Sequence, residues 1–391
     1  MATRVLIAGI SARGFAESAA RAGYEVTAVD GFGDLDLEAR AHRTIALRQA
    51  GDGDFRFRAR AAVRSARGIA CDAVAYVAGF ENHPRSVAAL ATARVLWGNP
   101  PAVLARVRDP LRLARALHKR GCATPEVRVA RASPASPTRW LLKPRASGGG
   151  HGIRSWRYEG GRRVPSEMYL QERMAGVAGS IVFAADGVRA VPLGMSRSLA
   201  GKRVFGARGF QYCGSILAGA DDAQFAADAR LCAAATVLAA AVTKEFGLVG
   251  VNGIDFIARR GVPYAIEVNP RYTASMELVE RTYGLSMFDI HARACAGALP
   301  TFDLAGARAA PGAIGKAIVY ARRTVTLDDT TSWLADGSVR DVPRPRERIA
   351  RGRPVCTIFA RGRDGADCYA ALGARAAALY RTIEPRVLRI A

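Results

Sequence analysis

The sequence predicts an α/β fold with more than one domain, and three observations support this prediction. The chain has 391 residues, which is too many for one compact core. Over the first hundred residues, short apolar runs alternate with helical stretches, a pattern typical of an open parallel sheet covered by helices. The segment WGNPP at 97–101 ends that alternation, and the chain beyond it is richer in strands.

The composition is that of a globular protein in a reducing compartment. Half of the residues are apolar, and no apolar run is long enough to span a bilayer. The N-terminus MATRVLIAGI leads directly into a strand-like run and lacks the features of a signal peptide. The seven cysteines are odd in number and no pair has metal-ligand spacing, so we expect reduced thiols, a buried Cys213 and a cytoplasmic location.

The net charge of +23 raises the question of a nucleic-acid partner. Arginine is spread along the whole chain, and the sequence has neither a basic tail nor a platform of basic and aromatic residues, so we expect no such partner. Because arginine is the usual cation here, a retained lysine indicates a place that needs a compact ammonium. The lysines are residues 119, 143, 202, 244 and 316.

Strand, helix and strand follow one another over residues 4–30. The turn at 9–14 matches a dinucleotide-binding fingerprint, except that Ser11 replaces the middle glycine. In the fingerprint, that glycine is needed for the backbone to approach a pyrophosphate. In a nicotinamide-dependent oxidoreductase Asp30 would hold the ribose, and this alternative stays open. We expect Arg13 and Glu81 at the carboxyl edge of the sheet, where ligands of such folds bind.

A glycine-rich hairpin is predicted for LLKPRASGGGHGIRSW at 141–156. Glycines allow backbone N–H groups to approach phosphate oxygens, and Lys143 before the loop offers a point charge to a phosphate. The alternative is a surface hairpin with a glycine-rich tip. The candidate nucleotide-binding residues are Lys143, Ser147, Gly148, Gly149, Gly150, His151 and Gly152.

A second candidate segment, MYLQERM at 168–174, follows this hairpin. We interpret its last four residues as a linker whose backbone groups read the edge of an adenine, with the thioether of Met174 on the ring. These four residues are Gln171, Glu172, Arg173 and Met174.

A third segment, NGIDFIARRGVPYAIEVNPR at 252–271, predicts two adjacent strands with acidic side chains on one face. Asp255, Glu267 and Asn269 then offer two carboxylates and an amide oxygen, which are ligands suited to Mg²⁺. Arg271 continues the row and could stabilise the charge of a phosphoryl intermediate. The alternative is an amphipathic hairpin with a polar outer face, but unpaired acids between buried runs would be costly.

With these three segments in this order, the chain resembles the ATP-grasp superfamily, and in particular its biotin-carboxylase-like branch. The motifs that carry the resemblance are Lys143 with SGGGHG, Gln171-Glu172, Asp255 and EVNPR at 267–271. GLVGVNGIDF and EVNPRYTASMELVERTYG look most like predicted archaeal-type carboligases. The resemblance implies a Rossmann-like preATP-grasp domain at 1–106, an ATP-grasp module at 107–305 and a strand-rich closing segment at 306–391.

The resemblance also implies a reaction, in which ATP and Mg²⁺ activate a carboxylate as an acyl phosphate that an amine then attacks. The substrates would be small molecules, with glutamate in the synthesis of a methanopterin- or methanofuran-type one-carbon carrier as one example. A carboxylase that uses bicarbonate is the alternative, and a homodimer is left open. Arg271 and Lys202 would act on the reacting groups, although a solvated loop explains the cations of residues 196–215 equally well.

The sequence departs from the family pattern at one phosphate contact. Many members have a second phosphate lysine in an Asp-Lys pair before a helix, whereas this chain has Asp109 followed by Pro110. Either Arg108 or Arg112 compensates, or the nucleotide binds more weakly.

Overall fold

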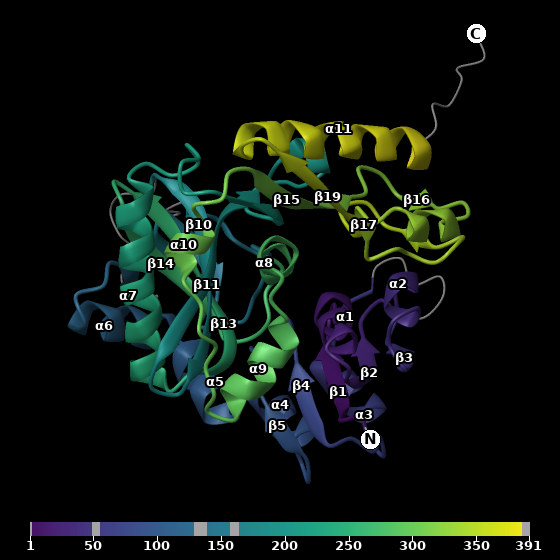
Figure 1. The fold of residues 1–391 in the computed structure, drawn as a ribbon, viewed down its shortest axis with the longest axis horizontal. Helices are drawn as coiled ribbons and strands as arrows, with labels where there is room; N and C mark the ends of the chain where they lie inside the picture. The colour runs from purple at the N-terminus through teal and green to yellow at the C-terminus, as the bar shows by residue number, and fades with distance from the viewer. Residues whose placement is uncertain (1, 49–54, 129–138, 157–163, 385–391) are drawn as a thin grey trace.

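The computed structural model describes residues 2–48, 55–128, 139–156 and 164–384, and it has the α/β architecture predicted from the sequence. Three larger sheets follow one another along the chain (Figure 1). In the described part of the chain, no helix has the length and apolar character needed to cross a membrane.

The N-terminal sheet is parallel, with strand order β3-β2-β1-β4-β5. The buried run of β1 lies at its centre, and helix α1 packs Phe15, Ala16 and Ala19 against it. The alternation in the sequence therefore predicted this sheet correctly. Its elements are β1 (Arg4–Gly9), α1 (Arg13–Arg21), β2 (Glu25–Asp30), α2 (Leu35–Glu38), β3 (Arg43–Ala46), α3 (Ala59–Ser65), β4 (Ala73–Tyr76), α4 (Pro84–Leu90) and β5 (Val95–Trp97).

Two helices lead from this sheet to a small four-stranded antiparallel sheet, β6-β9-β7-β8, which carries the predicted glycine-rich hairpin. Trp140, Leu142, Trp156 and Leu170 form its own hydrophobic core. The elements are α5 (Pro101–Val107), α6 (Pro110–Lys119), β6 (Val127–Arg128), β7 (Trp140–Pro144), β8 (Arg154–Ser155) and β9 (Met168–Glu172).

The central sheet has eight strands in the order β14-β13-β10-β11-β12-β15-β19-β17. Alternate residues of β10 face opposite sides, so that Ile181 and Phe183 pack toward α7 whereas Val182 and Ala184 pack toward α8, α9 and the N-terminal domain. Its elements and their covering helices are β10 (Val177–Asp186), β11 (Ala190–Ala200), η2 (Arg203–Phe205), β12 (Tyr212–Ala218), α7 (Asp228–Phe246), β13 (Val249–Arg259), β14 (Val262–Asn269), α8 (Met276–Tyr283), α9 (Met287–Cys295) and α10 (Leu304–Ala307).

The C-terminal segment extends the central sheet through β15, β19 and β17, and α11 lies across β15 and β19 at the top of Figure 1. The predicted strand-rich character of this segment is thus explained by strands that continue the central sheet. Its elements are β15 (Ala313–Tyr320), β16 (Val325–Thr326), η3 (Thr331–Ala335), β17 (Val339–Arg340), β18 (Arg348–Ile349), β19 (Pro354–Gly362) and α11 (Gly365–Ile383).

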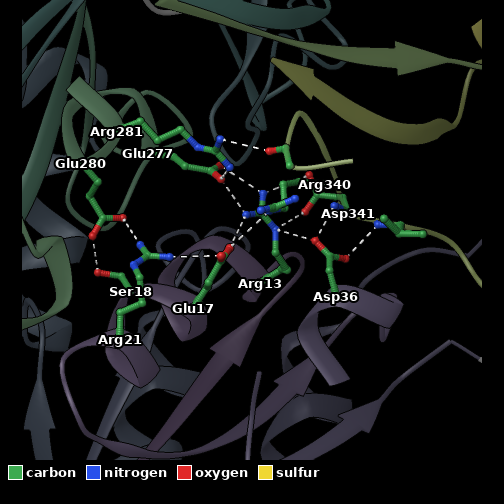
Figure 2. A network of polar contacts seen from close by, with 12 residues as sticks. Arg13, Glu17, Ser18, Arg21, Asp36, Glu277, Glu280, Arg281, Arg340 and Asp341 are labelled. Atoms are coloured by element: carbon green, nitrogen blue, oxygen red, sulfur yellow. Dashed lines mark hydrogen bonds and ion pairs between the residues drawn. The ribbon is translucent and has the colours of Figure 1, made fainter. Parts of the chain in front are cut away.

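Arg13 joins the three parts of the chain. Its guanidinium is 2% exposed and donates to both carboxylate oxygens of Glu277 in α8, at 2.6 and 3.0 Å. It also donates to Asp341 beyond β17, at 2.9 Å, and Lys316 of β15 donates to Glu277 at 2.7 Å. Figure 2 shows Arg13 with Glu277 and Asp341 between α1, α8 and the C-terminal segment. Arg13 therefore connects domains, although the sequence placed it at an open sheet edge.

The carboxylate of Asp30 belongs to the N-terminal turn. It is fully buried and accepts N–H bonds from Ala12, Phe32 and Gly33, at 2.6, 2.7 and 2.8 Å. A fully buried acid that accepts three backbone N–H bonds holds the turn together and is not exposed to a ribose. The local geometry therefore gives no support to the nicotinamide alternative.

His291 in α9 gives a prediction about stability and pH. The ring is 2% exposed, its Nδ1 accepts the Val251 N–H at 3.0 Å, and burial lowers its pKa to about 4. In the unfolded chain a histidine has a pKa near 6.5, so between pH 4 and 6.5 the unfolded chain binds more protons than the folded one. The contribution of His291 to the free energy of unfolding is therefore complete above about pH 6.5 and is lost toward pH 4. We expect a loss of about 3 kcal/mol from this group.

The matched variant is His291→Asn, which keeps an acceptor atom for the Val251 N–H and removes the titration. In denaturant unfolding at pH 4.5 and 7, the wild-type protein should lose more stability on acidification than the variant. An equal pH slope in the two proteins would contradict the buried neutral imidazole.

Candidate active site

A pocket lies between the small sheet and β14, the strand at one edge of the central sheet. It brings Lys143 and the adjacent glycine-rich loop together with Glu267, which lies more than a hundred residues further along the chain. Its remaining walls come from the junction of α5 and α6. The lining residues are Val107, Arg108, Pro110, Leu113, Lys143, Pro144, Arg145, Ser147, Gly148, Gly150, Ile153, Tyr169, Ile266, Glu267 and Val268.

Lys143 is buried on β7 and points along the small sheet toward β9. Its ammonium donates to Gln171 Oε1 at 2.9 Å and lies 5.8 Å from the centre of the Tyr169 ring. A lysine ammonium has three N–H donors, and the Gln171 oxygen accepts from one of them. Lys143 can therefore offer further donors to a ligand while Gln171 holds it in place.

The glycine-rich loop is docked against the central sheet. The Gly149 carbonyl accepts the Tyr212 N–H at 2.9 Å, and the Ser147 carbonyl accepts bonds from Arg108 at 2.9 Å and from Asn82 at 3.2 Å. Gly150 has φ +77°, and a Cβ there would collide with the Phe210 carbonyl oxygen. The loop therefore needs glycine at 150 for both its conformation and its contact.

This arrangement predicts different effects for two alanine substitutions in one loop. Gly150→Ala should release the loop from residues 210–212, because it adds both steric overlap and about 1 kcal/mol of backbone strain. Gly148→Ala is the control, since a Cβ there meets only Glu81 Oε1, at 3.9 Å. Hydrogen exchange of the backbone amides at 145–153 should increase in Gly150→Ala, whereas equal exchange in the two variants would contradict the docking.

The acidic hairpin has the predicted register. Asp255 on β13 lies directly opposite Glu267 on β14, and Gly253 lies opposite Asn269, so the three polar side chains share one face. The Asn269 amide donates to Asp255 Oδ2 at 2.9 Å, and Arg108 forms an ion pair with Glu267. The predicted trio is therefore contiguous, with Glu267 in the pocket wall and the other two beside it.

The electrostatics of this hairpin are those of two acids held close together. Burial raises the pKa of Asp255 to about 6, and the charge of Glu267 adds to the rise. A cation between two such carboxylates relieves their repulsion. Among the described residues, no three His, Cys, Asp or Glu side chains gather as a metal site, so a metal here would need the Asn269 oxygen or ligand oxygens as well.

Arg271 extends the row as predicted but also reaches the N-terminal domain. Its guanidinium forms an ion pair with Glu81 at 2.8 Å and donates to Asn269 Oδ1 at 3.2 Å. Burial tends to raise the pKa of Glu81, but the charges of Arg271 and Arg108 outweigh it and hold that pKa below its ordinary range. Glu81, expected at the sheet edge, thus fixes the candidate catalytic arginine.

The remaining predicted residues are not among those that line the pocket. His151 is exposed and its ring contacts the Gly148 carbonyl at 3.0 Å, and Gly152 has φ +74° in the same turn. Glu172 ends β9 and pairs with Arg139 at 2.7 Å, so its carboxylate is directed away from Lys143. Arg173 and Met174 follow in the segment between β9 and β10, and Lys202 precedes η2 near the loop-docking residues.

Two site residues escaped the sequence analysis because their partners lie far away in the chain. Asn82 donates to the glycine loop and accepts from Arg108 at 2.9 Å. Asn99 is 1% exposed and joins the end of the first domain to β13 through Asn252 Oδ1, at 2.8 Å, and to the Pro270 carbonyl, at 3.1 Å. The NP dipeptide at 99–100 marks the domain end, but nothing in it indicates this contact.

The comparisons with known proteins agree with this geometry. Residues 107–275 match the model of the ATP-grasp domain family. Comparison with curated protein sequences gave no match.

Solved structures resemble the whole chain. The biotin carboxylase domain of Hydrogenobacter thermophilus 2-oxoglutarate carboxylase, in complex with MgADP, ADP and bicarbonate, has a TM-score of 0.70 at 15% identity over 98% of this chain and 90% of that one. The L-amino acid ligase of Bacillus licheniformis has a TM-score of 0.65 at 17% identity over 95% and 96%.

Rhizobium etli pyruvate carboxylase has a TM-score of 0.71 at 16% identity over 96% of this chain, which spans only 37% of that enzyme's length. At these identities the similarity concerns the fold. Residues 107–275 are therefore an ATP-grasp domain, and the chain as a whole has the fold of the biotin carboxylase domains.

Proposed function

We propose that the protein is an ATP-dependent ligase that activates a carboxylate as an acyl phosphate and joins it to an amine, with release of ADP and phosphate. One observation carries the proposal: a single pocket places the Lys143 ammonium and the glycine-rich loop opposite Glu267. An ammonium, a bare backbone and an acidic pair together are suited to a magnesium polyphosphate.

The residues have separable roles in this proposal. Lys143, held by Gln171, donates to a phosphate oxygen, while the amides of residues 147–152 approach the others. Asp255, Glu267 and Asn269 fit a magnesium site, because the two acids face one another on adjacent strands. Burial raises the pKa of Asp255, and the charge of Glu267, which a cation would offset, adds to the rise. When bound, the metal would neutralise phosphate charge and help to orient the transferred group.

The reaction then depends on position and charge rather than on covalent chemistry of the protein. The substrate carboxylate attacks the γ-phosphorus, ADP leaves, and the amine displaces phosphate from the acyl phosphate to form the C–N bond. Arg271, fixed by Glu81, lies beside Asn269 and stabilises the developing negative charge. Lys202 remains a second candidate for the substrate carboxylate or the γ-phosphate.

The proposed substrates are small molecules that carry a carboxylate and an amine. Glutamate is the first amino acid to test, and a one-carbon carrier precursor of the methanopterin or methanofuran type is the first complex partner. A carboxylase that takes bicarbonate as its acid is the second candidate, supported by the whole-chain likeness to the bicarbonate-bound carboxylase domain. A homodimer is a further proposal, since that domain is described as a dimer.

A coupled assay for ADP release tests the proposal. Purified protein with Mg²⁺ and ATP is screened against pairs of acids and amines, with bicarbonate as a separate acid. We expect one pair to raise ADP release at least tenfold above the protein alone, with an equal amount of phosphate. Lack of nucleotide binding by calorimetry, with the protein folded, would exclude both the ligase and the carboxylase.

A further inference from the structure

Arg108 is a pocket residue whose guanidinium is fully bonded to protein atoms. It lies between α5 and α6 and is 11% exposed. Its Nε and Nη2 donate to Asn82 Oδ1 at 3.2 and 2.9 Å, and Nη2 also donates to the Ser147 carbonyl at 2.9 Å. Its Nη1 donates to the Val268 carbonyl at 3.0 Å and to the Glu267 carboxylate. These five contacts match the five N–H donors of the side chain.

The acceptors of Arg108 come from both walls of the pocket. Ser147 belongs to the glycine-rich loop, whereas Glu267 and Val268 belong to the acidic hairpin. A polyphosphate between these walls must therefore lie beside the guanidinium. Of the present acceptors, the Glu267 carboxylate is a group that the proposed metal would engage, and Ser147 belongs to the loop whose N–H groups would approach the phosphates.

We propose that Arg108 is a phosphate-binding residue, and that its ion pair with Glu267 is the form it takes before the nucleotide binds. This inference rests on the proposed function. Glu267 would be a ligand of the proposed metal, and Arg108 Nη1 would then be free to donate to a phosphate oxygen, an acceptor of the same charge type within the same pocket. Asn82 and Val268 continue to hold the guanidinium while its donors exchange partners.

The planar fork of arginine suits this exchange better than a single ammonium would, because its donors serve two acceptors at once. Arg112 provides a matched comparison. It is the same residue type, lies on the neighbouring helix α6, is exposed, and does not belong to the pocket lining. Pro110 does line the pocket, so a lysine introduced there places an ammonium in the same space.

The test is calorimetric binding of the non-hydrolysable ATP analogue AMP-PNP with Mg²⁺ to the folded full-length protein. We expect Arg108→Ala to weaken binding about 10- to 100-fold, and Arg108→Lys about 3- to 10-fold, from the loss of charge-assisted hydrogen bonds. Arg112→Ala should stay within twofold of wild type. Adding Pro110→Lys to Arg108→Ala should recover most of the loss, which a purely structural role of Arg108 would not allow.

Lys143→Ala separates the failure of this inference from the failure of the proposed function. If Lys143→Ala weakens binding but Arg108→Ala equals Arg112→Ala, Arg108 is no phosphate ligand and the inference is wrong. If wild-type protein binds no AMP-PNP, the proposed function itself fails. Should Arg108→Ala not fold, Arg108→Lys decides, and an affinity equal to that of Arg112→Ala overturns the inference.

Discussion

Glu267→Gln is expected to reduce ATP-dependent turnover on the order of 10³-fold, because it removes one of the two charges that would hold magnesium. The glutamine keeps the shape of the side chain and an oxygen that can accept from Arg108, so the fold should remain. The measurement is ADP release with the substrate pair identified by screening, together with the Mg²⁺ concentration needed for half-maximal rate.

Glu245→Gln provides the control for this substitution. Glu245 is a half-exposed glutamate on α7, paired with Arg120 at 2.9 Å and remote from the pocket lining. Its variant should keep wild-type turnover and the same magnesium dependence, since exposed ion pairs contribute about 0–1 kcal/mol. Full turnover in Glu267→Gln would refute the assignment of the acidic hairpin to metal binding.

The local features of the site could be predicted because they depend on short spacings. A strand period of two places Glu267 and Asn269 on one face, and the turn at 259–262 sets Asp255 opposite Glu267. The same reasoning gave the hairpin of Lys143 and its glycine turn. The scarcity of lysine was also informative: Lys143 and Lys316 are 5% and 4% exposed and paired, although Lys119 and Lys244 are exposed.

The rest could not be predicted because it depends on packing between distant segments. The sequence left open whether Arg108 or Arg112 compensates for the missing lysine, and only the fold distinguishes the pocket position of Arg108 from that of exposed Arg112. Asn82 contacts a loop 65 residues away. Arg13 meets Glu277 across 264 residues. Such contacts leave no period or spacing in the sequence, so the helices and strands can be predicted while the residues that join distant segments cannot.

Arg13→Ala is expected to destabilise the protein by about 3–5 kcal/mol. The change leaves Glu277 with Lys316 and Arg281 and leaves Asp341 without its main cation, in a region where both acids are largely buried. Burial tends to raise the pKa of Glu277, but the charges of Arg13 and Lys316 outweigh it and hold that pKa well below its ordinary range. Denaturant unfolding at pH 7 measures the loss.

Arg21→Ala tests whether the loss of stability expected for Arg13→Ala comes from the burial of Arg13 and not from its charge alone. Arg21 also lies on α1 and pairs with Glu17 and Glu280 of the same network, but its side chain is 52% exposed (Figure 2). Its removal should cost less than about 1 kcal/mol. Equal losses in the two variants would mean that Arg13 contributes no more than a surface ion pair. Because Arg13 contacts both Glu277 and Asp341, a selective loss would instead show that this side chain stabilises the three parts of the chain against one another.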